Sequence, residues 1–585
     1  MLRAAMLYIG AAWALSQGVA QLLPVFGIAN WIVRWFVIAA MIGFPFAMLF
    51  SWFYEWTPQG IRRESEVADD ASVTRKTGKK MDRWIIVVLA VAVVLLLANT
   101  FVLHTDEKTA AARVVHAAPG KSIAVLPFLN MSGDPKNDYF SDGITEEILN
   151  ALAQVPDLKV AARTSAFAFK GKNEDLRKVG RELDVSSVLE GSVQTSGAEV
   201  RITVQLIDTA SGYHRWSEKY DRKLTSVFAV EDEISKTVVD KLQVQLASGD
   251  NRPLVVEGTR DPRAHDFYLR GLELLPARGP GLREAMANFE QAVAIDPGYA
   301  QAWASLSFTY SLLPGYQLSS WEDAEKQAER TAERAIALGP NLAETHLARA
   351  YLLINQMKLP AAEQEYRKAL VINPGSAEAQ NQLGQLLLAT GRIDDAIAQE
   401  RVAASLDRYS GVVHYKLGTM LSSAHQYPEA IAQLGKTLEL APGFHYARFE
   451  LATVYLVTSR YADAEREMRT AAVTAGEDPE IVATIVRAIG DPSLRPQAER
   501  LLDAGVAPGD YELYGLKYAF WFSLLGAHDK AIASIQHWAA IATFGERYSG
   551  LQALALPAFD SVRNDPRFKA VLVALAASGK SDGQP

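Results

Sequence analysis

The chain has 585 residues, of which 49% are hydrophobic, with a formal net charge of -8 and no cysteine. This length is too great for one compact core, since a domain usually has about 100–200 residues, so several units are expected. The acidic balance argues against a nucleic-acid binder, which needs a clustered basic face to neutralise phosphates. The lack of cysteine excludes disulfides, thiolate zinc sites and cysteine nucleophiles.

Three apolar segments near the amino terminus are each about as long as a membrane-spanning helix, which needs about 20 apolar residues. They cover residues 4–23, 31–54 and 84–103. The first contains Ser16, Gln17 and Gln21, and a signal peptide is its competing interpretation. A second full-length segment follows after a short turn, so we expect residues 1–104 to form an α-helical membrane module of three transmembrane helices.

The loop at 61–83, between the second and third segments, sets the expected orientation. Its basic residues are Arg62, Arg63, Arg75, Lys76, Lys79, Lys80 and Arg83. Basic residues resist translocation, so this loop should remain in the cytoplasm together with the amino terminus. The sequence therefore predicts a protein of the bacterial inner membrane, in contact with the lipid bilayer, whose residues beyond His104 lie in the periplasm.

A small α/β domain with a mixed sheet is expected at 121–247, after a linker at 105–120. Strands are predicted at 122–128, 159–163, 187–195, 199–208 and 213–220, and helices at 143–154, 174–183 and 229–246. The turns Ser196-Gly197 and Ser211-Gly212 supply glycines, which tolerate the positive φ of tight hairpins. Apolar and polar residues alternate along 200–206, which is typical of a sheet with one solvated face.

This region resembles the domain related to FlgO and the TolB amino-terminal domain that occurs in bacterial integral membrane repeat proteins. The resemblance covers about residues 120–245, and its most specific phrase is DGITEEI at 142–148. The run Trp56-Thr57-Pro58-Gln59-Gly60 after the apolar hairpin is similar to the same proteins. That family often carries a class III cyclase or winged-helix domain and the label adenylate cyclase. We find no match to either domain in this sequence, so we expect the label not to apply.

An α-solenoid of repeats is predicted from residue 263 to 476. Equivalent helix-exit positions recur every 34 residues, at Pro340, Pro374, Arg408, Pro442 and Gly476. Small residues recur where paired helices touch, at Gly384, Gly418 and Ala452. The period and this pattern resemble the tetratricopeptide-repeat family. Pro297 precedes Pro340 by 43 residues, which indicates a longer loop near 313–320.

The resemblance implies that the first helix of each repeat lines a groove for a protein or peptide. The residues expected there are Tyr351, Asn355, Asn381, Gln385, Tyr415, Thr419, Tyr446, Phe449 and Thr453. Amides can satisfy a peptide backbone and aromatic rings supply contact area. The alternative is that some of these rings pack between repeats, as aromatic residues in solenoids often do.

The remaining segment, 477–577, is expected to hold a degenerate repeat and capping helices, including one from Pro557, before a tail at 578–585. The tripeptide Gly120-Lys121-Ser122 leads into a strand, whereas a phosphate loop follows a strand and opens a helix, so a phosphate loop is not expected here. Asp142 is expected to cap a helix rather than to bind a metal.

No catalytic residues, metal site, cofactor or nucleic-acid partner are therefore predicted. The expected function is that of a periplasmic scaffold or sensor. The alternative is a membrane signal-transduction component related to class III cyclase or winged-helix regulators but lacking their catalytic or DNA-binding domain.

Overall fold

The computed structural model describes residues 54–57, 60–63, 121–242, 244, 254–255, 258–275, 279–505 and 515–577. The chain divides into two compact units, residues 1–111 and 112–585. Over the residues given above, no helix is both long and apolar enough to cross a membrane. The three predicted spans lie outside them, apart from Tyr54.

In the first unit the structure describes one hairpin, made of β1 (Tyr54–Thr57) and β2 (Gly60–Arg63). The two strands pair antiparallel, with Tyr54 opposite Arg63 and Thr57 opposite Gly60. The predicted span therefore cannot extend as a helix to Tyr54, and the predicted loop begins inside a strand. The physical reason is local. The backbone N–H and C=O groups of this hairpin form hydrogen bonds between its two strands, so they are not available for the hydrogen bonds of a continuing helix.

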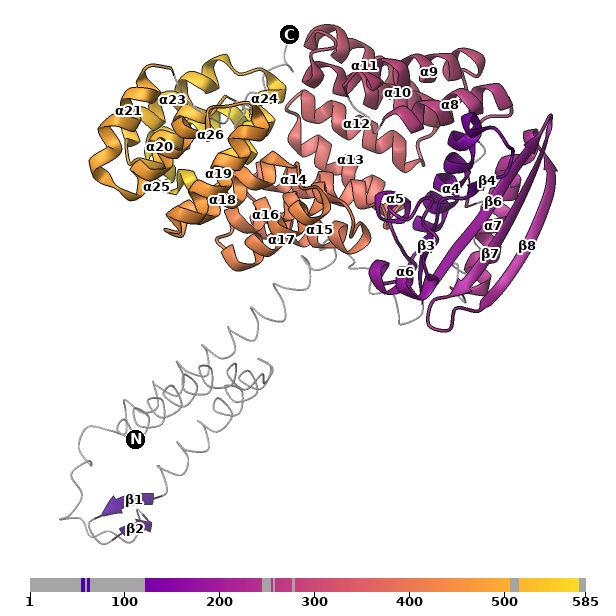
Figure 1. Cartoon of the computed structure of the whole chain (residues 1–585), viewed down its shortest axis with the longest axis horizontal. Helices are drawn as coiled ribbons and strands as arrows, with labels where there is room; N and C mark the ends of the chain where they lie inside the picture. Colours follow the sequence, from indigo (N-terminus) through magenta and orange to yellow (C-terminus); the bar gives the residue numbers. More distant parts are fainter. Residues whose placement is uncertain are drawn as a thin grey trace. The chain divides into compact units, whose positions relative to one another are not determined.

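The α/β domain contains a six-stranded mixed sheet with the order β5-β3-β6-β7-β8, in which β4 also pairs with β6 (Figure 1). The strands are β3 (Ser122–Val125), β4 (Leu129–Asn130), β5 (Lys159–Val160), β6 (Ser187–Ser196), β7 (Glu199–Asp208) and β8 (His214–Lys223). Strand β3 pairs parallel with β5 and β6, whereas β6, β7 and β8 form an antiparallel meander. Gly197 and Gly212 have φ values of 62° and 77°, as predicted for the hairpin turns.

Helices cover both faces of this sheet. They are η3 (Pro135–Asn137), α4 (Asp138–Ala153), α5 (Arg163–Phe167), α6 (Leu176–Leu183), η4 (Leu224–Ser226) and α7 (Val227–Lys241). Helices α4 and α7 form the main core with Ile123, Ile202 and Val204, which are fully buried. A smaller core on the other face joins α6 to Val188. The rest of that face is solvated, as the alternation along β7 predicts.

Three local predictions in this domain are wrong, and the first is the strand at 122–128, which ends at Val125. Helix α4 begins at Asp138, so Asp142 lies inside it and does not cap it. Its carboxylate instead accepts a hydrogen bond of 2.5 Å from Lys170 Nζ. The predicted strand at 159–163 ends at Val160, and Arg163 begins α5. The helix starts five residues earlier than predicted, at Asp138, because this first turn buries the rings of Tyr139 and Phe140.

The repeat array follows as consecutive antiparallel helix pairs, which Figure 1 shows in chain order. Its helices are α8 (Pro262–Leu274), α9 (Gly281–Ile295), α10 (Ala300–Leu312), η6 (Leu313–Tyr316), α11 (Trp321–Leu338), α12 (Ala343–Asn355), α13 (Leu359–Ile372), α14 (Ala377–Ala389), α15 (Ile393–Leu406), α16 (Gly411–Ser423), α17 (Tyr427–Leu440), α18 (His445–Val457) and α19 (Tyr461–Ala475). We call the side formed by the first helices α10, α12, α14, α16 and α18 the groove face.

Two structural features recur with the 34-residue period: close contacts between paired helices, and hydrogen bonds to the carbonyl groups that follow the second helices. A Cβ on Gly384 would lie 2.9 Å from Glu400 Oε2, and one on Gly418 would lie 2.8 Å from Leu434 Cγ, so the paired helices approach closely at both positions and a larger residue would displace a neighbour. At equivalent positions, His346 Nε2 donates to the Pro340 carbonyl and Arg448 to the Pro442 carbonyl. These bonds satisfy carbonyl groups at the helix exits, which would otherwise lack intrahelical partners.

The carboxyl-terminal segment folds back onto the array. Its elements are α20 (Pro479–Gly490), η7 (Pro492–Leu494), α21 (Arg495–Asp503), α22 (Lys517–Leu524), α23 (His528–Ile541), α24 (Phe544–Ala553), η8 (Pro557–Phe559), α25 (Asp560–Arg563) and α26 (Pro566–Ala577). Helix α26 packs on α23, but η8 contacts α18 and α22. The single capping helix predicted from Pro557 is therefore wrong, because the stretch forms three elements and the last begins at Pro566, a residue that starts a helix but interrupts a preceding one.

The α/β domain and the first repeats share one hydrophobic core, which runs from the sheet through α4 into α8, α9 and α10. Further along the array, the Ala162 amide donates to the Leu406 carbonyl at 2.8 Å. Ser165 Oγ donates to the Asp407 carboxylate at 2.6 Å and accepts from the Tyr409 amide. The two domains therefore form one continuous body within the second unit.

Candidate partner-binding groove

All nine residues predicted for the groove lie on first helices, as the repeat period requires. Tyr351 and Asn355 are on α12, Asn381 and Gln385 on α14, Tyr415 and Thr419 on α16, and Tyr446, Phe449 and Thr453 on α18. Seven are half-buried, whereas Phe449 and Thr453 are buried. Their role in binding a partner stays a prediction, but the structure gives them very different surroundings.

Phe449 and Thr453 do not line an open surface. The Phe449 side chain is 6% exposed and packs on the rings of Phe520 and Trp521, with centroids 5.2 and 6.5 Å away. Thr453 is fully buried and donates to the Phe449 carbonyl within its own helix. These residues belong to the packing between α18 and α22, because the carboxyl-terminal segment supplies an apolar partner that the repeat period does not reveal.

Helix α24 covers part of the groove face earlier in the array, where it packs against α12 and α14. Gln552 Nε2 donates to the Gln385 carbonyl at 3.4 Å. At the other end of α24, Gly545 lies against the Trp321 indole, so that a Cβ there would be 2.3 Å from the ring. Asn381 and Gln385, which hydrogen-bond each other at 2.8 Å, therefore lie on a helix that the chain itself covers.

The tyrosines of the next two repeats contact each other and a neighbouring phenylalanine. Tyr415 lies 5.3 Å from Phe444 and 6.4 Å from Tyr446, measured between ring centroids. Thr419 donates its hydroxyl to the Tyr415 carbonyl. These contacts agree with the alternative in which the rings pack between repeats, and each ring keeps part of its surface exposed.

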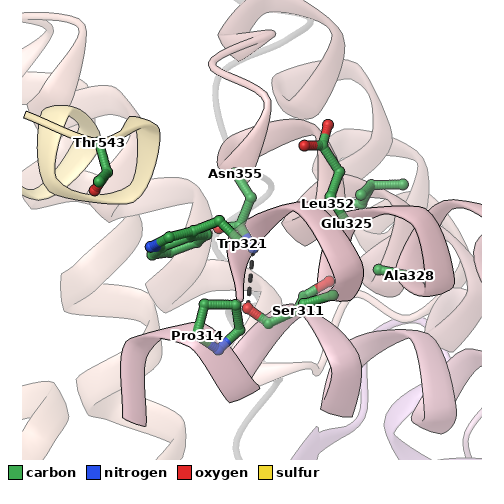
Figure 2. Close-up of a pocket in the computed structure, with 9 residues that line it drawn as sticks. Ser311, Pro314, Trp321, Glu325, Ala328, Leu352, Asn355 and Thr543 are labelled. Atoms are coloured by element: carbon green, nitrogen blue, oxygen red, sulfur yellow. Dashed lines mark hydrogen bonds between the residues drawn. The ribbon is translucent and has the colours of Figure 1, made fainter. Parts of the chain in front are cut away.

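The groove face is hollowed beside α12, where a cavity of about 230 Å³ lies between three repeat helices and the start of α24 (Figure 2). Its lining residues are Ser311, Pro314, Trp321, Ala324, Glu325, Ala328, Leu352, Asn355 and Thr543. We call it the Trp321 pocket. Of the predicted groove residues only Asn355 lines it, and its Nδ2 donates to the Ser311 carbonyl at 3.0 Å.

Sequence reasoning missed Trp321 and Glu325, although a signal for them exists. The spacing of 43 residues from Pro297 to Pro340 exceeds the period of 34, and the additional residues form η6 and lengthen the loop before α11. Pro314 on η6 supplies one wall of the pocket. Long loops inside regular arrays often carry binding residues, so this irregularity indicates a candidate binding region.

Two buried carboxyl groups lie behind the groove face. Burial raises the pKa of Glu400 to about 8, against a smaller opposing effect of Lys416. Burial likewise raises the pKa of Glu450 to about 7. Both oxygens of Glu400 lack a hydrogen-bond partner among the described residues. Burying a charged carboxylate without hydrogen-bond partners costs more free energy than burying the neutral carboxylic acid. Glu400 is therefore protonated near neutral pH.

A second acidic cluster lies where the α/β domain meets α8. Glu147 accepts from His265 Nε2 at 3.1 Å, and the fully buried Glu231 lies beside it. Burial and the Glu147 carboxylate raise the pKa of Glu231 well above its ordinary value. Burial opposes ionisation of Glu147 as well, but the His265 imidazole prevails and lowers the pKa of Glu147. Among the described residues, no three His, Cys, Asp or Glu side chains are arranged to hold a metal.

Comparisons with known proteins agree with the repeat architecture. Two models of the tetratricopeptide repeat match residues 365–398 and 415–479. The chain therefore carries tetratricopeptide repeats, and proteins with such repeats bind peptides or proteins through the repeat groove. Among solved structures, pilF of Pseudomonas aeruginosa is 17% identical, with a TM-score of 0.28, over 44% of this chain and 98% of that chain. A tetratricopeptide-repeat protein of Thermus thermophilus is 20% identical, with a TM-score of 0.29, over 33% and 99%.

A curated protein of Rhizobium meliloti (strain 1021), named "Putative adenylate cyclase 3", is 42% identical over 247 residues. The match covers 41% of this chain and 42% of that protein, so the chain spans about two fifths of the length of this relative. The name of this relative is the label that the repeat proteins of the sequence resemblance often carry. The activity named for the relative belongs to that protein.

Proposed function

We propose that the protein is a membrane-anchored scaffold or sensor that binds a protein partner through its tetratricopeptide repeats. The observation that carries this proposal is the Trp321 pocket, a hollow on the groove face of an array whose family binds peptides and proteins. Helix α24 packs against this face at α12 and α14, and η8 contacts it at α18. The partner site is therefore proposed at the Trp321 pocket, between α10, α11 and α12, rather than along the whole array.

The membrane location rests on the sequence alone. Three apolar segments at 4–23, 31–54 and 84–103, with the basic loop 61–83, support a bacterial inner-membrane protein with its repeats in the periplasm. A reporter active only in the periplasm should work when fused after Gly120 and fail when fused near Gly78. The opposite pattern would overturn the orientation, and activity at both positions would overturn the three-span arrangement.

The partner-binding role is tested by crosslinking in cells, followed by purification of the full chain and mass spectrometry. One recovered protein should cross-link to peptides of α11 or α12, and Tyr351→Ala with Asn355→Ala should reduce its recovery several-fold. Glu439→Ala with Arg466→Ala, at exposed positions on second helices, is the matched control and should change little. Crosslinks confined to exposed residues of the sheet, such as Arg201 and Lys219, would move the binding role to the α/β domain.

A second candidate function is a signal-transduction component related to the cyclases, and the name of the Rhizobium relative favours it. We propose that this chain itself acts by binding and not by catalysis. An assay for cyclic-nucleotide formation with the purified full-length protein separates the two functions. Background rates are expected, and steady turnover would refute the proposal that the chain is not an enzyme.

A further inference from the structure

The Trp321 pocket has walls of two chemical kinds. Its apolar walls come from Pro314 on η6, from Ala324 and Ala328 on α11, and from Leu352 on α12. The Trp321 side chain lies across it, as Figure 2 shows, and Glu325 and Asn355 supply polar atoms at its edge. An apolar cavity with a few convergent polar groups is the usual composition of a binding pocket.

The helix start at Trp321 holds this wall in place. Ser320 caps α11 by accepting a hydrogen bond from the Asp323 amide at 3.1 Å. Gly545 presses on the Trp321 indole from α24, which leaves the ring little freedom to move. Thr543 begins α24 with a capping box to Glu546, which engages its hydroxyl. The pocket is therefore preformed, which lowers the entropy cost of binding.

Apart from the Trp321 indole N–H, which Figure 2 shows on the side away from Ser311 and Asn355, the polar atoms of the pocket that remain available are acceptors. Asn355 uses its amide donor on the Ser311 carbonyl, and Glu325 Oε1 accepts from Gln356 Nε2 at 2.9 Å. This leaves Asn355 Oδ1 and Glu325 Oε2 without a donor from the described part of the chain. A complementary ligand must bring N–H groups, and the Glu325 carboxylate favours N–H groups that carry positive charge.

The size of the pocket limits the ligand further. Its volume of about 230 Å³ is below the ~300–1,000 Å³ of typical small-molecule sites, so it suits a single long side chain. Lysine and arginine combine an apolar stem, which packs on walls such as Ala324 and Leu352, with a cationic head. A cation near the face of an indole gains about 0.5–2 kcal/mol in general, which adds to the attraction of the carboxylate.

We propose that the Trp321 pocket binds the side chain of a lysine or arginine from the protein partner. The cationic head pairs with Glu325 and with the Asn355 amide oxygen, and the stem lies along the apolar walls. The proposal rests on the proposed function, since the basic side chain belongs to the partner that the repeats bind.

The first test uses small probes and needs no partner. N-acetyl-lysine methylamide, N-acetyl-arginine methylamide and the uncharged N-acetyl-norleucine methylamide are titrated against the full chain in detergent by saturation-transfer NMR. The two cationic probes should bind at least about fivefold more tightly than norleucine, and added salt should reduce this preference. Glu325→Gln should abolish the preference, whereas Glu329→Gln, at an exposed position one turn further along α11, should retain it.

The outcomes distinguish failure of the pocket proposal from failure of the proposed partner-binding function. Equal affinity of all three probes, or an unchanged preference in Glu325→Gln, would overturn the proposal. Failure of every probe would also overturn it. If Glu325→Gln loses the probe preference but no partner cross-links to the repeats, the pocket stands and the proposed function fails. If a partner cross-links equally to wild type and Glu325→Gln, the function stands and the basic side chain is refuted.

Discussion

The early and late repeats are built from the same helix pairs, but their groove faces are filled to different extents. Beside α11 and α12 the face keeps a cavity of about 230 Å³. At α18 the equivalent face is filled, because Phe449 packs on Phe520 and η8 contacts the helix. The repeat family implies a groove along the whole array, but the carboxyl-terminal segment decides which part of that groove remains open.

The largest expected effect tests the filled region. Phe449→Ala should lower the free energy of unfolding by about 3–5 kcal/mol, since it removes a buried ring from well-packed surroundings. Tyr446→Ala, one turn earlier and half-buried, should cost less, about 1 kcal/mol for the loss of ring contacts. Chemical denaturation of the purified full chain measures both. Equal costs would mean that α22 does not fill the face at α18.

The next effect concerns the buried Glu400 behind the groove face. Its pKa is raised from 4.5 to about 8, so between these values the folded chain holds a proton that the unfolded chain releases. Stability should therefore fall as pH rises from about 4.5 to 8. A tenfold change in proton affinity is worth about 1.4 kcal/mol, so Glu400→Gln should gain a few kcal/mol at pH 8 and little at pH 4.5.

The control for this effect is Glu439→Gln, because Glu439 is exposed on α17 and pairs with nearby Lys436. Thermal unfolding midpoints of the three proteins across this pH range provide the measurement. Parallel curves for wild type and Glu400→Gln would contradict the assignment of a neutral, buried acid to Glu400.

A smaller effect is expected at the boundary between the two regions. Gly545→Ala places a methyl group 2.3 Å from the present position of a Trp321 ring carbon, so α24 must shift. Overpacking of this kind generally costs about 1–3 kcal/mol. Hydrogen exchange should become faster in α24 and near Trp321, but remain unchanged in α18. Unaltered exchange in α24 would show that Gly545 does not hold this helix on the array.

The sequence predicted the regular parts of the molecule well, because each depends on local periodicity. The alternation of Val200, Arg201 and Ile202 indicated β7, whose bounds agree with the prediction. Gly384 and Gly418 marked close helix contacts correctly. These signals need no knowledge of distant segments.

The sequence did not predict what covers the groove face. Phe449 has the same spacing as an exposed groove residue, and only its distant partner Phe520 makes it a core residue. The Trp321 pocket likewise needs Thr543, which lies far along the chain. Non-local packing of an irregular segment leaves no periodic signal, so these features required the structure.

The most direct test of the central claim compares two positions on the array. A photo-reactive amino acid is placed in the full chain at Glu329, which is exposed and adjoins the pocket residue Ala328, or at Gln385, whose carbonyl accepts a hydrogen bond from Gln552 of α24. Irradiation of cells should give a partner adduct from position 329 and none from position 385. A partner adduct from position 385 without one from position 329 would contradict the claim that binding occurs at the Trp321 pocket.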